Sequence, residues 1–371
     1  MMVAARVLAL IQKEFLALFR DPKGRIVLIM PPLLQLFIFA FAATLEVTNV
    51  HLAVLNDDPG KHGAEIVQRL VGSPTFTEIE FADDTDSIHT LMDRQQVIAA
   101  VHIPQAFSRD LERGPAAQIQ IILDGRRSNA AQIVSGYIVQ IANAYGWEVQ
   151  VERGRETIPV VITERNWFNE NLLYLWFSVP SLVAVLALLV TVVVTSLSVA
   201  RERELGTFEQ LLVSPLTPFE ILIGKTVPAV VIGMGEGAII ALAAVFVFGI
   251  PFTGSIGLLA LALFAFVMSI VGAGLFISSI AKTQQQAMLG AFVFLVPVVA
   301  LSGYASPIDN MPHWLRIVNE VNPLKHFLIT TKGLFLKDMP ASEVWANSWP
   351  LLLIGLVTLV VSGWFFARRL E

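Results

Sequence analysis

Cysteine is absent from the 371-residue sequence, and charged residues make up only 15% of it. Without cysteine there is no disulfide scaffold, no thiolate catalysis and no zinc or iron–sulfur site with thiolate ligands. Ordinary soluble domains contain about 25% charged residues. Because a soluble chain of this length would spread far more charge over its surface, a single soluble domain is excluded. The net charge of −5 argues against nucleic acid as the main partner.

Long stretches without charge account for this deficit. A membrane helix needs about 20 apolar residues, and Ile26–Leu45, Asn171–Ala200, Thr283–Ile308 and Val344–Ala367 carry no charge at all. Residues 226–281 carry one, and the turn residues at 249–254 divide this stretch into two spans. The first stretch is too long and begins too late for a cleaved signal peptide. We therefore expect six spans, at residues 26–45, 176–199, 223–248, 256–280, 286–304 and 349–367.

The distribution of Lys and Arg predicts the orientation in the membrane. Cytoplasmic loops carry an excess of both residues, and five of them precede the first span. If residues 1–25 are cytoplasmic, the basic residues that flank the other spans fall on the same side. These are Arg201, Arg203, Lys225, Lys282, Arg368 and Arg369. The sequence thus predicts a multi-pass protein of the cytoplasmic membrane with both termini inside.

Residues 46–171 then form one large segment outside the membrane. They contain 18 acidic and 10 basic residues, a net charge of −8. Alternating or β-branched runs predict strands at 51–55, 97–101 and 117–123. Helical periodicity predicts helices at 61–71 and 129–151, and a short helix at 104–113 is ended by Gly114-Pro115. The fold class is therefore an α-helical membrane protein with six spans and an inserted extracytoplasmic α/β domain.

Residues 1–25 read as a cytoplasmic amphipathic helix. The apolar residues of one face are Val3, Val7, Leu10, Ile11, Phe15, Leu18 and Phe19. Arg6, Lys13 and Glu14 are expected on the other faces. Such a helix can lie in the membrane interface or pack against the protein's own cytoplasmic surface. The two interpretations are compatible.

No pattern in the sequence predicts catalysis or a metal site. Gly224-Lys225-Thr226 resembles the end of a P-loop, but the first glycine of that motif would fall on Phe219. The six histidines show no metal-ligand spacing. Residues 83–86, Asp-Asp-Thr-Asp, lack the glycine and distal glutamate of a calcium loop and are interpreted as a solvated loop. We expect no enzyme activity, metal or cofactor on this chain.

Residues 201–225 connect the second and third predicted spans. Thr207 with Gln210, and Thr217 with Glu220, fit the capping-box pattern that begins a helix. Ser214-Pro215 would end the first of these helices. A short helix with defined ends that is joined directly to two membrane spans would be rigid enough to transmit force between them. The alternative is an interfacial helix that merely covers the loop.

The same residues carry a resemblance to a known family. The sequence R-E-R-E-L-G-T-F-E-Q-L from Arg201, followed by Pro215, Glu220 and Gly224-Lys225, resembles the signature of type-2 ABC exporter permeases. Lys13 to Pro22 resembles the family's N-terminal helix, and Pro31–Phe39 its first span. Residues 305–345, with Pro307, Met311-Pro312 and Asn322-Pro323, resemble its extracytoplasmic hairpin. Residues 46–171 resemble the large periplasmic domain of the bacterial multidrug-type branch.

The resemblance implies partners and site residues. Such permeases of the bacterial inner membrane carry no ATPase; ATP and Mg²⁺ bind a separate nucleotide-binding subunit. Two permease copies, identical or homologous, pair in the membrane lipid, and some relatives engage a periplasmic adaptor. The apolar character of the expected permeation path would suit a drug, a lipid or another amphiphile as the exported substrate. A coupling helix at 201–216 would dock on the ATPase. The implied ATPase-coupling residues are Glu14, Arg201, Glu202, Arg203, Glu204, Gly206, Thr207, Glu209 and Pro215.

Glu236 is the only ionisable residue inside the apolar part of a predicted span. It follows Lys225 by 11 residues, about 16 Å along a helix, which places it near the middle of a hydrocarbon layer of about 30 Å. A carboxylate there must face protein or a wet cavity. It would either contact a polar or cationic substrate, or a proton, on the permeation path, or hydrogen-bond to a neighbouring helix in a structural role. Two other functions stay open: an ion- or proton-coupled secondary transporter that uses Glu236, and a membrane-anchored sensor.

Overall fold

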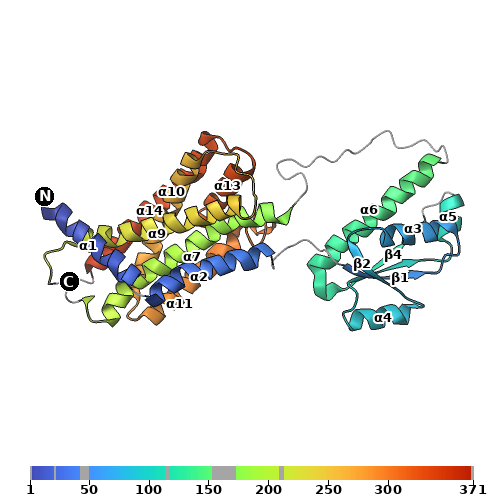
Figure 1. The fold of residues 1–371 in the computed structure, drawn as a ribbon, viewed down its shortest axis with the longest axis horizontal. Helices are drawn as coiled ribbons and strands as arrows, with labels where there is room; N and C mark the ends of the chain where they lie inside the picture. The colour runs from blue at the N-terminus through green and yellow to red at the C-terminus, as the bar shows by residue number, and fades with distance from the viewer. Residues whose placement is uncertain are drawn as a thin grey trace. The chain divides into compact units, whose positions relative to one another are not determined.

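The computed structural model describes residues 2–20, 22–41, 50–113, 117–152, 173–208 and 213–368. It divides into two compact units (Figure 1). The helical unit comprises Met1–Ala43 and Arg165–Glu371, and the α/β unit comprises Thr44–Glu164. Each unit has its own hydrophobic core.

The helical unit is built from long apolar helices. In chain order its helices are α1 (Met2–Arg20), α2 (Pro22–Phe41), α7 (Tyr174–Glu204), α9 (Pro218–Phe246), α10 (Ile256–Ile280), α11 (Gln284–Leu301), α12 (His313–Asn319), α13 (Pro323–Leu336) and α14 (Ala341–Arg368). Among the described residues, five are long and apolar enough to cross a membrane: α7, α9, α10, α11 and α14. α2 contributes the shorter apolar stretch Met30–Phe41, and residues 42–45 of the predicted first span lie outside the described residues. The sixth span stays a prediction.

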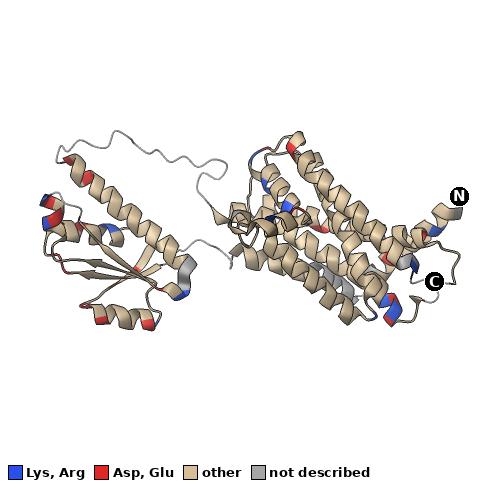
Figure 2. Cartoon of the chain, turned by 180° about the vertical axis from the view of Figure 1, so that it is seen from behind, with Lys and Arg blue, Asp and Glu red and all other residues tan. Residues whose placement is uncertain are grey.

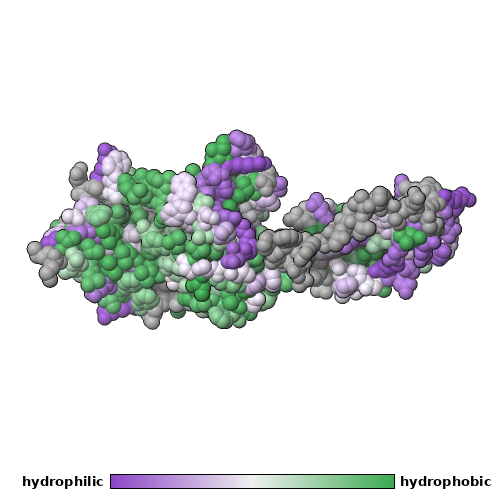
Figure 3. Space-filling model, turned by 90° about the horizontal axis from the view of Figure 1, so that it is seen from above, coloured by the Kyte–Doolittle hydropathy of each residue, from purple (hydrophilic) through white to green (hydrophobic). Residues whose placement is uncertain are grey.

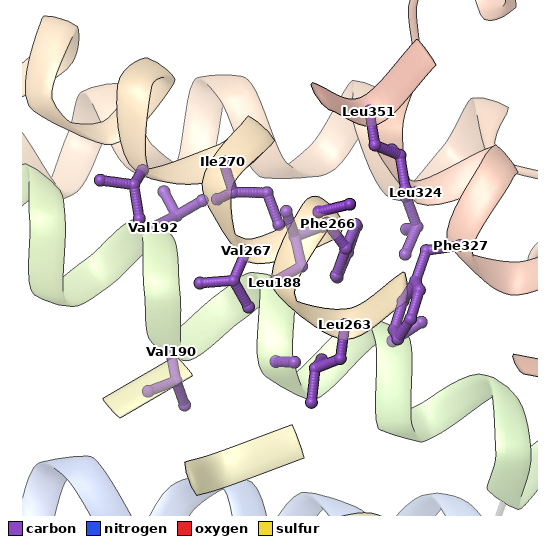
Figure 4. Packing of buried hydrophobic residues seen from close by; sticks show 14 of the residues in the cluster. Leu188, Val190, Val192, Leu263, Phe266, Val267, Ile270, Leu324, Phe327 and Leu351 are labelled. Carbon is purple, nitrogen blue, oxygen red and sulfur yellow. The ribbon is translucent and has the colours of Figure 1, made fainter. Parts of the chain in front are cut away.

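Helix α7 lies at the centre of this unit. Its side chains Leu188, Val190 and Val192 belong to one buried cluster with residues of α10, α13 and α14 such as Phe266, Leu324 and Leu351 (Figure 4). Within this core the rings of Phe266 on α10 and Phe327 on α13 stack with their centroids 4.3 Å apart. The outer surface is also largely hydrophobic (Figure 3), as in α11, where Val293 is 75% exposed. An apolar core inside an apolar surface is what a helix bundle in lipid requires.

Local sequence signals set the helix boundaries of this unit. The capping box predicted before α9 is confirmed: Glu220 N donates to Thr217 Oγ1 at 3.3 Å, and Thr217 N donates to the Glu220 carboxylate at 2.7 Å. The turn predicted between two spans lies between α9 and α10. α14 begins at Ala341, eight residues before the predicted span, because its first turns are helical without being apolar.

The α/β unit is a four-stranded sheet covered on both faces. Its strands are β1 (Val50–Asn56), β2 (Phe76–Phe81), β3 (Ala99–Ile103) and β4 (Gln120–Leu123). Their order is β2-β1-β3-β4, parallel except for β4. Its helices are α3 (Lys61–Val71), α4 (Thr85–Asp93), α5 (Phe107–Arg113) and α6 (Ser128–Glu152). Leu52 and Val54 face the core shared with α3, α5 and α6, whereas Ala53 and Leu55 face α4 (Figure 1).

Two elements of this unit are absent from the sequence prediction. β2 was not expected because only Phe76 of its six residues is buried, as at a sheet edge. The interpretation of residues 83–86 as a solvated loop is wrong in part: Asp84 accepts a hydrogen bond from Ser87 N at 2.7 Å and caps α4, which begins at Thr85. This capping also lowers the pKa of Asp84. Gly114-Pro115, the predicted end of α5, lies outside the described residues.

A buried polar cluster fixes the connection between β1 and α3. The Asp58 carboxylate accepts hydrogen bonds from Gly63 N at 3.1 Å and from the amide and hydroxyl of Ser108. His62 Nδ1 lies 2.5 Å from the Tyr145 hydroxyl of α6. Because Asp58 binds the first turn of α3 and the start of α5 together, the cluster has a structural role in the α/β unit.

Candidate functional site: a charged joint in the helical unit

Charged side chains gather at the end of the helical unit that holds α1 and the α7–α9 connection (Figure 2). Four of them form a compact group, here named the charged joint: Lys13 and Glu14 on α1, Glu202 in the last turn of α7, and Lys225 in α9. Two positive and two negative side chains make the joint neutral overall.

Lys225 is the centre of the charged joint. Its Nζ lies 3.0 Å from Glu14 Oε1 and 2.9 Å from Glu202 Oε2, and its side chain is 2% exposed. The same Nζ donates to the backbone carbonyl of Ser198 at 3.4 Å. One buried ammonium group therefore connects three helices, α1, α7 and α9. Loss of one partner from a buried ion pair is strongly destabilising, because it leaves an uncompensated charge.

Lys13 lies at the solvent-exposed side of the charged joint. Its Nζ hydrogen-bonds to Glu202 and lies 3.5 Å from Glu14. Burial alone lowers the pKa of Lys13, but the hydrogen bond to Glu202 and the negative charges of both glutamates outweigh burial and raise the pKa above 10.5. Lys13 is therefore charged at neutral pH, as the neutrality of the joint requires.

α1 packs closely on α9 beside these ion pairs. Gly224 leaves no room for a side chain, since a Cβ there would lie 2.3 Å from Leu10. Arg6 donates to the carbonyl of Pro215 at 2.8 Å, which ties α1 to the α7–α9 connection as well. The expectation that Glu14 lies away from the packed face of α1 is wrong, because its carboxylate is directed to Lys225. Glu14 follows Leu10 by one helical turn and so lies on the same face of α1, where it pairs with the buried cation.

The residues next to Glu202 bind other helices. Arg203 donates to the carbonyls of Ser279 at 2.6 Å and Ala281 at 3.0 Å, at the end of α10. Glu204 accepts a hydrogen bond of 2.7 Å from Gln284 N, at the start of α11, where a negative charge also complements the helix dipole. Three consecutive side chains thus connect the end of α7 to α1, α9, α10 and α11.

α7 ends in a motif that requires glycine. Gly206 has a φ of +71°, its N–H donates to Arg203 O at 3.1 Å, and Thr207 N donates to Glu202 O at 2.9 Å. This pair of bonds is a Schellman motif, in which glycine takes the left-handed position. The predicted segment 201–216 is therefore not a separate helix throughout, since Arg201–Glu204 belong to α7. Glu209 and Gln210 lie outside the described residues.

Sequence reasoning missed Lys225, Lys13 and Arg6 as members of this site. From the sequence, Lys225 is interpreted as part of a P-loop-like pattern, of the cytoplasmic charges and of the family signature, but not as the partner of buried carboxylates inside α9. A signal was present: a lysine two turns into an apolar helix needs a buried anionic partner. The sequence could not say which carboxylate would supply it.

Glu236 occupies the middle of α9 and is 7% exposed. A Cβ at Gly233 would lie 2.4 Å from Thr191 on α7, and one at Gly237 would lie 2.8 Å from Leu263 on α10. α7 and α10 therefore pack closely against α9 beside Glu236. Among the described residues, none contributes a hydrogen bond or a charge to its carboxyl group.

The arrangement can fasten helices and transmit movement between them. Among the described residues, no group of three or more His, Asp or Glu side chains could hold a metal ion. The charged joint contains no nucleophile beside a general base, the geometry that covalent catalysis needs. Its chemistry is that of ion pairs and hydrogen bonds.

Comparison with known proteins identifies the family of the chain. Residues 23–364 match the model of the family described as "ABC-2 family transporter protein". The chain is 43% identical, over 364 residues, to the "Probable multidrug ABC transporter permease YbhR" of Escherichia coli (strain K12), which covers 98% of this chain and 99% of the relative.

Two further relatives from the same organism agree. The "Probable multidrug ABC transporter permease YbhS" is 32% identical over 337 residues, covering 89% of this chain and 88% of the relative. The "Inner membrane transport permease YhhJ" is 31% identical over 300 residues, covering 79% of each. The chain therefore belongs to the ABC-2 transporter family and is a membrane permease subunit of an ABC exporter.

Proposed function

We propose that this permease exports its substrate with ATP hydrolysed on a separate nucleotide-binding subunit, and that the charged joint carries the movement of that subunit into the helix bundle. The family supports the pairing with an ATPase. In this mechanism the coupling residues do no bond-breaking chemistry. In addition to the residues of the charged joint, they include Arg201, Gly206, Thr207, Glu209 and Pro215.

One observation carries the mechanism: Lys225 bridges Glu14 and Glu202 in a site that is 2% exposed. Because three helices share one buried cation, the end of α7 cannot move without moving α1 and α9, or breaking the ion pairs. A force applied at residues 205–216 therefore reaches the bundle directly. A loop covered only by an interfacial helix would not need such a joint.

We further propose six spans in the bacterial inner membrane, with the α/β unit outside and both termini in the cytoplasm. Met30–Phe41 of α2 supplies the apolar part of the first span. The beginning of α1 and the end of α14 lie at the same end of the helical unit (Figure 1), as an even number of spans requires. The basic residues of α1 and of the last turn of α7 favour the cytoplasm for this end.

A second permease copy, or a homologous permease, would complete the transporter. The outer face of α11 supports this, since Leu289, Phe292 and Val293 are each more than half exposed. A periplasmic adaptor would meet the α/β unit, whose segment carries a net charge of −8. For the substrate we propose an amphiphile such as a drug or lipid, in keeping with the word "multidrug" in the names of two relatives.

Isolation of the complex tests this function. The chain purified from its native membranes is expected to bring down a soluble P-loop ATPase whose activity rises with the transported substrate. Glu209→Lys reverses a charge on the proposed docking segment. It should reduce both ATPase recovery and export, while the amount of permease in the membrane stays unchanged. Normal recovery and export in this variant would show that residue 209 is not part of the docking segment.

Glu236 motivates a second candidate function, substrate or proton binding within the bundle. The structural alternative needs a hydrogen-bond partner on a neighbouring helix, and no described residue contributes one. Glu236→Gln keeps the size of the side chain and removes its charge. A role on the permeation path predicts loss of export for cationic substrates, or an altered pH profile, in complexes that still assemble.

Transport assays at several pH values, with one cationic and one neutral amphiphile, check this prediction. Thr191→Val is a suitable comparison, because it removes a nearby hydroxyl without changing charge. Unchanged export and pH profile in Glu236→Gln would assign the residue a structural role. Uncoupled transport without any ATPase would favour the secondary transporter instead.

A further inference from the structure

An apolar groove of about 650 Å³ lies between α9, α10 and α14. This volume falls in the range of small-molecule sites, about 300–1,000 Å³. Phe219 and Val230 of α9, Phe264 of α10, and Leu356 and Trp364 of α14 are among its lining residues. The groove is on the side of α9 that does not carry the charged joint, and none of the residues named for coupling lines it.

The groove is about as long as one lipid leaflet is thick. It extends along α9 from Phe219, the second residue of the helix, to Val230 and Val231. Eleven residues of helix span about 16 Å, and half of a hydrocarbon layer of about 30 Å is about 15 Å. The groove therefore runs from the end of α9 next to the α7–α9 connection toward the middle of that helix, over about the thickness of one leaflet.

A positively charged side chain, that of Arg368, lies next to one end of this groove. Arg368, in the last turn of α14, is exposed, and its Cζ lies 4.1 Å from the centre of the Trp364 ring. Trp364 itself lines the groove. The cation–π contact holds the guanidinium group beside the opening. Tryptophan and arginine are typical anchors at the headgroup level of a bilayer.

We propose that this groove is a phospholipid site, which binds one acyl chain of an anionic phospholipid and places the headgroup phosphate at Arg368. The apolar lining matches the chain, the length matches one leaflet, and Arg368 supplies charge complementarity. A free phosphate would leave the apolar volume unfilled. The site is distinct from the export path proposed above and does not depend on it.

The test uses the full chain, delipidated in detergent and then titrated with phosphatidylglycerol or phosphatidylethanolamine. Native mass spectrometry counts the bound lipids. The wild type is expected to hold one phosphatidylglycerol per chain in preference to phosphatidylethanolamine. Arg368→Gln should keep the bound chain but lower the preference for the anionic lipid about fivefold, the contribution of one basic residue near an anionic headgroup.

Val360→Trp should fill the groove and abolish the one-to-one binding. Val360 lines the groove and is 61% exposed, so the larger side chain need not enter the core. Gly363→Leu fills the groove from a second position. Val357→Phe is the matched control, since Val357 is an exposed residue of α14 that does not line the groove. Lys282→Gln is the matched charge control.

Three results would overturn the proposal. If Val360→Trp and Gly363→Leu both bind lipid as the wild type does, the groove is not the binding site. If the wild type binds the two lipids with equal affinity, Arg368 does not select the anionic headgroup. A broad distribution of lipid numbers, without a one-to-one species, would mean that only the general lipid annulus was measured.

Discussion

Lys225→Met is expected to abolish export. The substitution leaves Glu14 and Glu202 without the cation that they share, in a site where the Lys225 side chain is 2% exposed. Removing one partner of a buried ion pair costs about 3–5 kcal/mol, a large share of the 5–15 kcal/mol that stabilises a typical protein. α1 should lose its attachment to α9, and ATP hydrolysis on the partner should no longer drive transport.

Export in membrane vesicles and thermal unfolding of the purified chain measure this effect. Lys282→Met is the control, because Lys282 is an exposed lysine after α10. The double variant Lys225→Met with Glu202→Gln should unfold at a higher temperature than Lys225→Met alone, since it leaves one carboxylate, Glu14, for the one remaining cation, Lys13. If Lys225→Met exports and unfolds like the wild type, the joint has no role in coupling.

Substitutions at Gly206 are expected to reduce export in the order Asn, Ala, Pro. Asparagine tolerates a positive φ, whereas alanine in the left-handed region costs about 1–2 kcal/mol. Proline has a φ fixed near −65° and no N–H, so it cannot adopt the φ of +71° or donate to Arg203 O. Gly206→Pro should therefore remove the Schellman motif and disconnect residues 207–216 from the end of α7.

The measurement for this series is export normalised to the amount of permease in the membrane. Gly257→Ala, in the first turn of α10, is the matched control, because its only near neighbour is the Ser255 hydroxyl at 3.7 Å. Two results would contradict a role for the positive φ of Gly206. One is equal export in the Ala and Pro variants, and the other is normal export in the Pro variant.

Elements with strong local signals were predictable from the sequence. The predicted helix 61–71 matches α3, and the Thr217 capping box marks the start of α9. Strand β3 runs from Ala99 to Ile103, two residues later than expected, because Val97 and Ile98 are buried without being part of the ladder. Local pattern identifies an element more reliably than it identifies its ends.

Contacts between distant residues were not predictable in the same way. Helical geometry places Glu14 one turn after Leu10, on the face of α1 that packs on α9, but it does not say which residue of α9 the carboxylate meets. Nothing in the residues around Glu14 indicates that partner. The coupling role of this segment stays a prediction, whereas the ion pairs that would serve it are visible only in the folded bundle.

The separation of Lys225 and Glu14 along the chain has a consequence for biogenesis. The two residues are 211 positions apart, and a ribosome that adds 5–20 residues per second makes the second about 10–40 s after the first. During this time Glu14 has no partner on another helix, and the charges of α1 stay at the polar surface of the membrane. The ion pairs form only after α9 has been inserted, so they complete the assembly of this end of the protein rather than begin it.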